Sequence, residues 1–163
     1  MPEETINGYL MHYEMNGDGQ PLVMIHGGLG GGEGSLSMSE HHAETFSGDY
    51  RFICYDRRAA GKSEMPAGGY DLPNQVQDLR SLLERLDVTH AHVLGSSAGG
   101  PIAMSFALDY PEMVDSLLLI NTMSYDSHDE RQARQNELDN LLANEAALGR
   151  TDAVEKALEA RQP

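Results

Sequence analysis

Apolar and polar positions divide the chain into short, mainly apolar runs and longer periodic stretches. The runs at 21–25, 51–55, 91–94 and 114–120 have the length and residue types of buried strands. Stretches with apolar residues three or four positions apart predict amphipathic helices, and they lie at 36–46, 70–86 and 98–108. Near the N-terminus, residues 8–15 lie between Asn-Gly and Gly-Asp-Gly turns, which predicts two short antiparallel strands at a sheet edge.

This order of elements predicts an α/β fold with a doubly wound, mostly parallel sheet. Parallel neighbours need right-handed crossovers, so helices should cover both faces of the sheet. The pattern changes near Asp126, because residues 127–148 and 151–161 are charged, Ala-rich and helical, with a thin apolar stripe. We therefore expect two regions, a core at 1–125 and a helical region at 126–163.

The turn after the run at 91–94 carries the most specific signal for chemistry. It has the pattern Gly95-x-Ser97-x-Gly99 between a predicted strand and a predicted helix, which is typical of a nucleophile elbow. A sharp turn exposes the serine hydroxyl and crowds the residues two before and two after it, which must be small and here are glycine. The following helix directs its first N–H groups toward the place where negative charge develops in a reaction. Ser97 is therefore the candidate nucleophile.

Two further loops follow predicted strands. The first begins His26-Gly27-Gly28-Leu29 and continues with glycines, so its backbone must approach something closely or adopt positive φ. The second begins at Asp56 and ends Gly61-Lys62-Ser63, similar to a phosphate-binding loop. Asp56 replaces the first glycine of that motif, and its charge would repel a phosphate. A degenerate nucleotide-binding protein is therefore the disfavoured alternative.

Composition narrows the class of protein. The chain of 163 residues carries a formal net charge of −15, which argues against nucleic acid and anionic membrane surfaces as partners. A single cysteine, Cys54, cannot form a disulfide within the chain. No signal peptide or membrane-spanning run appears, so a cytoplasmic location is expected. No H-E-x-x-H or C-x-x-C motif occurs, so no metal site is expected.

Three motifs, taken in order, resemble those of the α/β-hydrolase family. They are His26-Gly27-Gly28, the Asp56-Arg57-Arg58-x-x-Gly61-x-Ser63 loop and the elbow at 95–99, within a match that runs over residues 8–122. The chain is most similar to the branch of small esterases, peptidases and carbon–carbon hydrolases. A helical cap follows the sixth strand in that branch, so residues 126–163 would begin the cap.

The resemblance implies a role for each motif. Ser97 would attack a carbonyl carbon and become acylated. The backbone N–H groups of Ala98 and Gly28 would form the oxyanion hole, with Leu29 as the alternative to Gly28. The supporting residues of these motifs would be His26, Gly27, Gly95 and Gly99. The implied activity is hydrolysis of a small carboxylic ester or related acyl substrate, and no cofactor is needed.

The family's chemistry leaves alternatives open. Peptidase, lactonase, carbon–carbon hydrolase and haloperoxidase-like activities all fit a serine at the elbow. Epoxide hydrolase and dehalogenase activities fit less well, because the family members with those activities have aspartate there. A catalytically inactive, hydrolase-like binding module is a further alternative.

The family's catalytic acid and histidine follow the cap, so the hydrolase core is expected to be incomplete in this chain. The one histidine after the elbow is His128, close to Asp126, and an exposed position in a loop is the preferred interpretation of it. We expect a complementary polypeptide to supply the remaining strands, the acid and the histidine. It would also cover the apolar edge that the run at 114–120 would otherwise leave.

Overall fold

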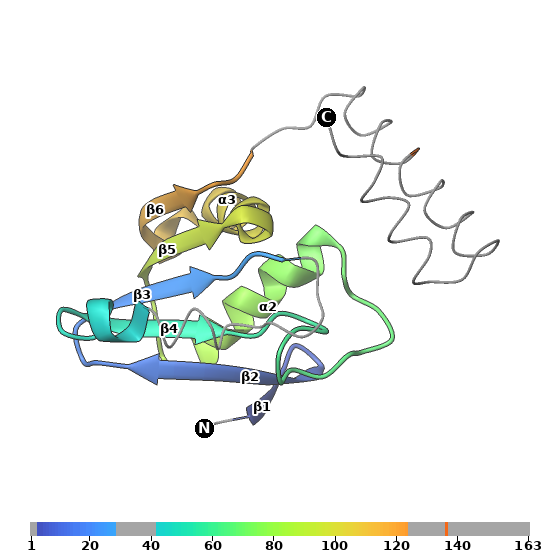
Figure 1. Cartoon of the computed structure of the whole chain (residues 1–163), viewed down its shortest axis with the longest axis horizontal. Coiled ribbons are helices and arrows are strands. Elements are labelled where there is room, and N and C mark those ends of the chain that lie inside the picture. Colours follow the sequence, from blue (N-terminus) through green and yellow to red (C-terminus); the bar gives the residue numbers. More distant parts are fainter. Residues whose placement is uncertain (1–2, 29–41, 124–135, 137–163) are drawn as a thin grey trace, which may run out of the picture. The chain divides into compact units, whose positions relative to one another are not determined.

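The structure is a computed structural model, and it describes residues 3–28, 42–123 and 136. Within this part of the chain, six strands form one sheet in the order β1-β2-β4-β3-β5-β6 (Figure 1). β1 and β2 form an antiparallel pair, β2 pairs antiparallel with β4, and all other neighbours are parallel. The strands are β1 (Glu3–Ile6), β2 (Tyr9–Asn16), β3 (Gln20–Ile25), β4 (Tyr50–Tyr55), β5 (Ala91–Ser96) and β6 (Val114–Ile120). The predicted α/β class with a mostly parallel sheet is therefore confirmed.

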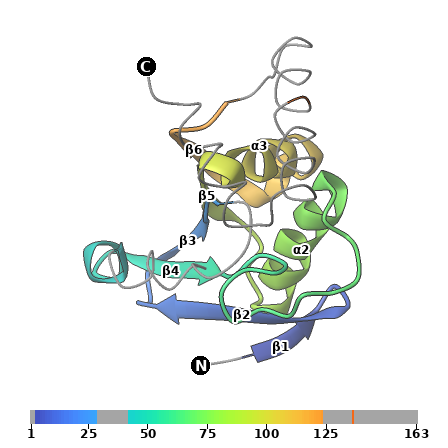
Figure 2. The same cartoon turned by 45° about the vertical axis from the view of Figure 1, so that its right-hand side comes forward.

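Helices cover both faces of the sheet, as the strand order requires. α2 (Leu72–Arg85) and α3 (Gly100–Asp109) pack on one face, and a helical turn at 42–46 packs on the other (Figures 1 and 2). β3 shows the alternation that makes this possible. Val23 lies in the apolar cluster of α2 and α3, and its neighbour Met24 lies in the cluster of the opposite face. A central strand covered on both faces must be apolar at every position, and the run at 21–25 is.

α2 illustrates how local sequence fixes an element. Asp71 has an extended backbone, and its carboxylate accepts a hydrogen bond from the Asn74 N–H at 3.0 Å, so Asp71 is the N-cap. The helix therefore begins at Leu72, two residues later than the predicted 70–86. The predicted apolar stripe includes Leu72, which is 37% exposed because it stands in the uncovered first turn. The buried part of the stripe is Val76, Leu79, Leu82 and Leu83.

Some predicted element bounds differ from those in the structure, and others lie outside the described residues. The strand predicted at 91–94 extends to Ser96, and α3 begins at Gly100, two residues later than the predicted 98. This delay arises because residues 97–99 form a separate 3₁₀ turn. The predicted helix at 36–46 is described only from residue 42. The domain boundary near 125 and the helices beyond Asp126 lie outside the described residues, apart from Asn136, and stay predictions. None of the helices in the described part is long and apolar enough to cross a membrane.

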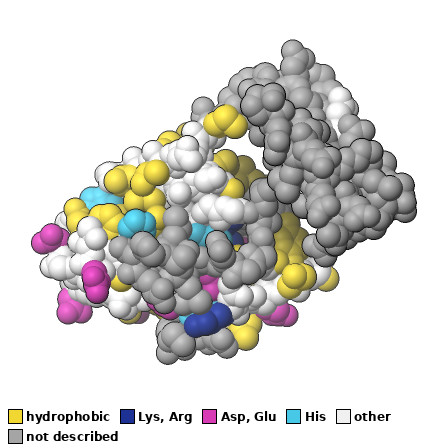
Figure 3. Space-filling view, viewed as in Figure 1, with side chains coloured by type: hydrophobic (Ala, Val, Ile, Leu, Met, Phe, Trp, Pro, Cys, Tyr) yellow, Lys and Arg dark blue, Asp and Glu magenta, His cyan; other side chains and the backbone are white. Residues whose placement is uncertain are grey.

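β6 forms one edge of the described sheet. It pairs with β5 on one side, and its apolar side chains from Leu117 to Ile120 are 38–49% exposed. Hydrophobic side chains are visible on the surface in this region (Figure 3). Such an edge presents both unpaired backbone groups and apolar surface, the two features that favour pairing with another strand.

Candidate active site

Ser97 lies at the corner between β5 and α3. β5 ends at Ser96, a 3₁₀ turn covers Ser97–Gly99, and α3 starts at Gly100. The backbone of Ser97 has φ +48°, in the left-handed region, which costs a residue other than glycine about 1–3 kcal/mol. The residue is exposed. Ser97 is therefore both solvent-exposed and held in a strained backbone conformation.

Tight packing around the corner explains the glycines of the motif. A Cβ at Gly95 would lie 2.7 Å from the Cβ of Ala103 on α3. A Cβ at Gly99 would overlap the carbonyl oxygen of Ile25. Neither position has space for a side chain, because the backbone of the corner packs directly against α3 at Gly95 and against β3 at Gly99.

The glycine-rich loop after β3 lies directly against the corner. A Cβ built on Gly27 would be 2.9 Å from the Cβ and 3.6 Å from the Oγ of Ser97. The next residue, Gly28, has φ +82°, which glycine adopts without strain. The structure thus brings together Ser97 and the loop that carries the predicted donor Gly28, whereas Leu29 lies outside the described residues.

His26 is a buried residue of this loop, 3% exposed. Its Nδ1 lies 2.6 Å from the Gly27 carbonyl oxygen, and its Nε2 lies 3.0 Å from the Arg57 backbone nitrogen. Because the Arg57 N–H can only donate, Nε2 accepts and Nδ1 carries the proton. Burial, together with the nearby charge of Arg57, lowers the pKa of His26. A neutral ring with both nitrogens engaged holds the loop and is not free to act as a base.

The Arg57 side chain reaches the same loop from the segment that follows β4. Its Nη2 donates to the Gly27 carbonyl at 3.1 Å and also to the Gly28 carbonyl, and its Nη1 donates to Gln75 Oε1 at 3.3 Å. The sequence indicated Arg57 only as part of a loop motif. Its contact with a loop 30 residues earlier has no signal in the sequence.

Thr122, two residues after β6, holds the corner itself. Its Oγ1 donates to the Ser97 carbonyl oxygen at 2.7 Å, and the backbone N–H of Gly100 donates to the same oxygen. A Cβ at Gly100 would overlap the Thr122 side chain, so the two residues fit closely. No pattern in the sequence marks Thr122 as a site residue.

The loop after β4 folds around its own aspartate. Asp56 is fully buried, and its carboxylate accepts the Lys62 N–H at 2.9 Å and fills the space beside Gly61. Ser63 Oγ donates to the Asp56 carbonyl at 2.7 Å. A carboxylate lies inside the loop, where a phosphate-binding loop would hold its anion, and this disfavours the nucleotide-binding alternative.

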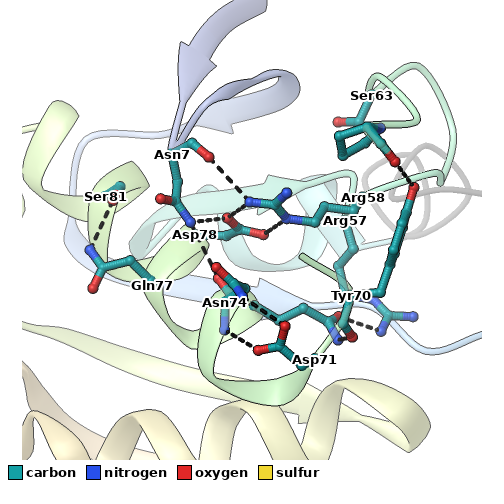
Figure 4. A network of polar contacts seen from close by, with 12 residues as sticks. Asn7, Arg57, Arg58, Ser63, Tyr70, Asp71, Asn74, Gln77, Asp78 and Ser81 are labelled. Carbon is teal, nitrogen blue, oxygen red and sulfur yellow. Dashed lines mark hydrogen bonds and ion pairs between the residues drawn. The ribbon is translucent and has the colours of Figure 1, made fainter. Parts of the chain in front are cut away.

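Arg58 ties this loop to α2 through a buried polar network (Figure 4). Its guanidinium donates to both carboxylate oxygens of Asp78, with Nε and Nη2 each at 2.7 Å. Asn7 Nδ2 donates to the same carboxylate at 2.7 Å, and the guanidinium lies over the Tyr9 ring, 4.4 Å from its centroid. Both adjacent arginines therefore contact α2, Arg57 through Gln75 and Arg58 through Asp78, but only Arg57 also donates to the carbonyls of the glycine-rich loop.

His90 and His92, two further histidines of the described part, have hydrogen-bond partners away from Ser97. His90 Nδ1 lies 2.7 Å from Asp115 Oδ2, and His92 Nδ1 lies 2.8 Å from Ser116 Oγ. Within residues 3–28 and 42–123, no histidine ring hydrogen-bonds to the Ser97 hydroxyl, and no cluster of three metal-ligating side chains occurs. His128 and Asp126 lie outside the described residues.

A mostly parallel sheet with helices on both faces and an exposed serine at a strand-to-helix corner defines a class of protein, and comparison with known proteins agrees. The sequence model of the alpha/beta hydrolase fold matches residues 20–157. The chain belongs to the alpha/beta hydrolase family.

Individual relatives have different activities. A soluble epoxide hydrolase from Corynebacterium sp. is 34% identical over 119 residues, which are 73% of this chain and 40% of that protein. A proline iminopeptidase from Lactobacillus acidophilus is 35% identical over 124 residues, 72% of this chain and 42% of that protein. Among solved structures, an esterase from Exiguobacterium antarcticum matches with a TM-score of 0.75 and 26% identity, over 89% of this chain and 56% of that one. The chain thus spans about half the length of these relatives or less.

Proposed function

We propose that this protein is a serine hydrolase that cleaves a small carboxylic ester or a related acyl compound. The observation that carries the proposal is Ser97 itself: exposed, held at φ +48° and packed against the Gly27–Gly28 loop. Backbone strain at an exposed polar residue is typical of functional sites. Membership of the alpha/beta hydrolase family supports hydrolysis as the reaction class.

The proposed reaction has two halves. A histidine takes the proton of Ser97 Oγ while this oxygen forms a bond to the carbonyl carbon, and the carbonyl electrons move onto its oxygen. The backbone N–H groups of Gly28 and Ala98 stabilise that oxyanion. The bond to the leaving alcohol then breaks, and the alcohol takes the proton from the histidine. Water repeats the sequence on the acyl-enzyme, which releases the acid and restores the Ser97 hydroxyl.

The base of this reaction would come from outside the described part of the chain, because the His26 ring is neutral and fully engaged. We propose that a further polypeptide segment pairs with β6 and supplies the acid and the histidine. The exposed apolar side chains of Leu117 to Ile120 support this placement, since an added strand and its helix would cover them. This segment would complete both the sheet and the catalytic set.

The relatives named above include an epoxide hydrolase, an iminopeptidase and an esterase, so family membership alone does not choose between activities. The residue at the elbow favours acyl chemistry. A serine hydroxyl forms an acyl ester that water can cleave at its carbonyl carbon, as an esterase or peptidase requires. Ester and amide substrates are therefore both within the proposal, with esters preferred.

A fluorophosphonate probe, which reacts with activated serines, tests the proposal on the active assembly. We expect covalent labelling on the peptide that contains Ser97 and its loss in Ser97→Ala. Ser96→Ala is the matched control, because it removes a hydroxyl one residue away and should keep the labelling. Removal of a nucleophile typically lowers kcat by about 10⁶-fold. Absence of labelling in the wild-type assembly would overturn the proposal in favour of the binding module.

A further inference from the structure

The two backbone donors of the proposed oxyanion hole share a structural feature. The N–H of Gly28 belongs to the same peptide unit as the Gly27 carbonyl, and the N–H of Ala98 belongs to the same unit as the Ser97 carbonyl. In a planar trans peptide the N–H and the C=O point in opposite directions. A contact that fixes either carbonyl therefore also fixes the direction of the corresponding N–H.

Both carbonyls are held by two donors. The Gly27 oxygen accepts from His26 Nδ1 at 2.6 Å and from Arg57 Nη2 at 3.1 Å. The same guanidinium also donates to Gln75 on α2, so Arg57 links the glycine-rich loop to a rigid helix. The Gly28 carbonyl, one residue further on, also accepts from Arg57.

The second carbonyl has an equivalent arrangement. The Ser97 oxygen accepts from the Gly100 N–H, which lies within the elbow, and from Thr122 Oγ1 at 2.7 Å. Thr122 follows β6, so this contact ties the elbow to a separate strand. Arg57 and Thr122, which are distant in sequence, thus hydrogen-bond the carbonyl oxygens of the two peptide units that carry the proposed N–H donors.

We propose that Arg57 and Thr122 are positioning residues of the oxyanion hole, which orient the N–H groups of Gly28 and Ala98 from behind. The inference rests on the proposed serine hydrolase function. A hydrogen bond to a carbonyl also polarises its peptide and makes the opposite N–H a stronger donor. The charge of the Arg57 guanidinium increases this effect on the Gly28 side, since charged donors are the stronger ones.

Four variants in the active assembly test the inference. Arg57→Ala and Thr122→Val remove the two contacts, whereas Arg57→Lys and Thr122→Ser keep a donor at each position. The readouts are the rate of fluorophosphonate labelling at Ser97 and the kcat and KM for p-nitrophenyl acetate. Complete loss of an oxyanion donor costs about 10²–10³-fold in kcat.

A misdirected donor should cost less than a missing one. We expect kcat and the labelling rate to fall about 10–100-fold in Arg57→Ala and about 10-fold in Thr122→Val, with KM within about two-fold. Thr122→Ser should restore most of the rate and Arg57→Lys part of it, because a lysine can reach one carbonyl but lacks the planar fork.

Arg58→Lys is the matched control, because Arg58 is adjacent in sequence but contacts Asp78 and not the loop carbonyls. It should lower the melting temperature and keep the wild-type labelling rate well below that temperature. Wild-type rates in folded Arg57→Ala and Thr122→Val would overturn the inference. Should Arg57→Ala fail to fold, the nearly isosteric Thr122→Val and its serine counterpart decide alone. Absence of labelling in the wild-type assembly would instead remove the proposed function, so the two failures are distinguishable.

Discussion

The ion pair between Arg58 and Asp78 allows a quantitative prediction about stability. Both side chains are buried, at 7% and 2% exposed, and the guanidinium meets the carboxylate through two hydrogen bonds of 2.7 Å. Asp78→Asn keeps the size and shape of the side chain and removes its charge. The Arg58 guanidinium then stays buried against neutral groups, which include the Tyr9 ring and the carbonyl oxygens of Gly68 and Asn7.

Removal of one partner from a buried ion pair costs about 3–5 kcal/mol. We take about 3 kcal/mol, since asparagine can still accept one of the two hydrogen bonds. For a chain of this size, 1 kcal/mol corresponds to about 2–4 °C in Tm, so Asp78→Asn should lower Tm by about 10 °C. Differential scanning calorimetry or a circular dichroism melt measures the shift.

The control is on the same helix. Glu84→Gln breaks the exposed pair with Arg80, whose two side chains are 39% and 52% exposed, and it should leave Tm nearly unchanged. The double variant Arg58→Met/Asp78→Leu removes both charges and should recover much of the lost stability. A Tm for Asp78→Asn within about 2 °C of wild type would refute the reasoning, because it would mean that the guanidinium is solvated in the folded protein.

Three further predictions concern packing, pH and the sheet edge. Gly95→Ala places a Cβ 2.7 Å from that of Ala103 and should lower the free energy of unfolding by about 1–3 kcal/mol, whereas Gly68→Ala, with open space around it, should have little effect in the same chemical denaturation series. Burial lowers the pKa of His26 below its ordinary value of about 6.5, so the unfolded chain binds the extra proton more readily. The resulting stability is complete above pH 6.5 and is lost as pH falls toward the pKa of the folded state; melts from pH 8 to 5 should show this decline, and it should be smaller in His26→Gln. Leu118→Lys puts a charge on the exposed edge strand β6 and should weaken its pairing with another strand. Analytical ultracentrifugation should then show a lower sedimentation coefficient. An unchanged sedimentation coefficient would show that β6 does not pair with the further polypeptide segment.

Much of the fold could be predicted from the sequence, because its signals are local. The apolar run at 21–25 predicts a central strand on its own, and the stripe of α2 predicts a helix that packs on one face. The same is true of the corner at Ser97, since a strand, two glycines and a helix within ten residues leave few other conformations. Helix ends were less accurate, because caps such as Asp71 depend on the backbone conformation of single residues.

The sequence by itself determined most of the elements, their order, and that Ser97 stands at a sharp strand-to-helix corner. The two strands predicted within 8–15 were wrong, because that stretch forms the single strand β2 and its antiparallel partner β1 lies before it. Only the tertiary structure decided what surrounds that corner. The carbonyl partners of Arg57 and Thr122 lie about 30 and 25 residues away in sequence, and of the two adjacent arginines only Arg57 contacts the glycine-rich loop. Hydrophobic periodicity and glycine spacing report the conformation of a segment, whereas a hydrogen bond between distant segments depends on where the whole sheet brings them together.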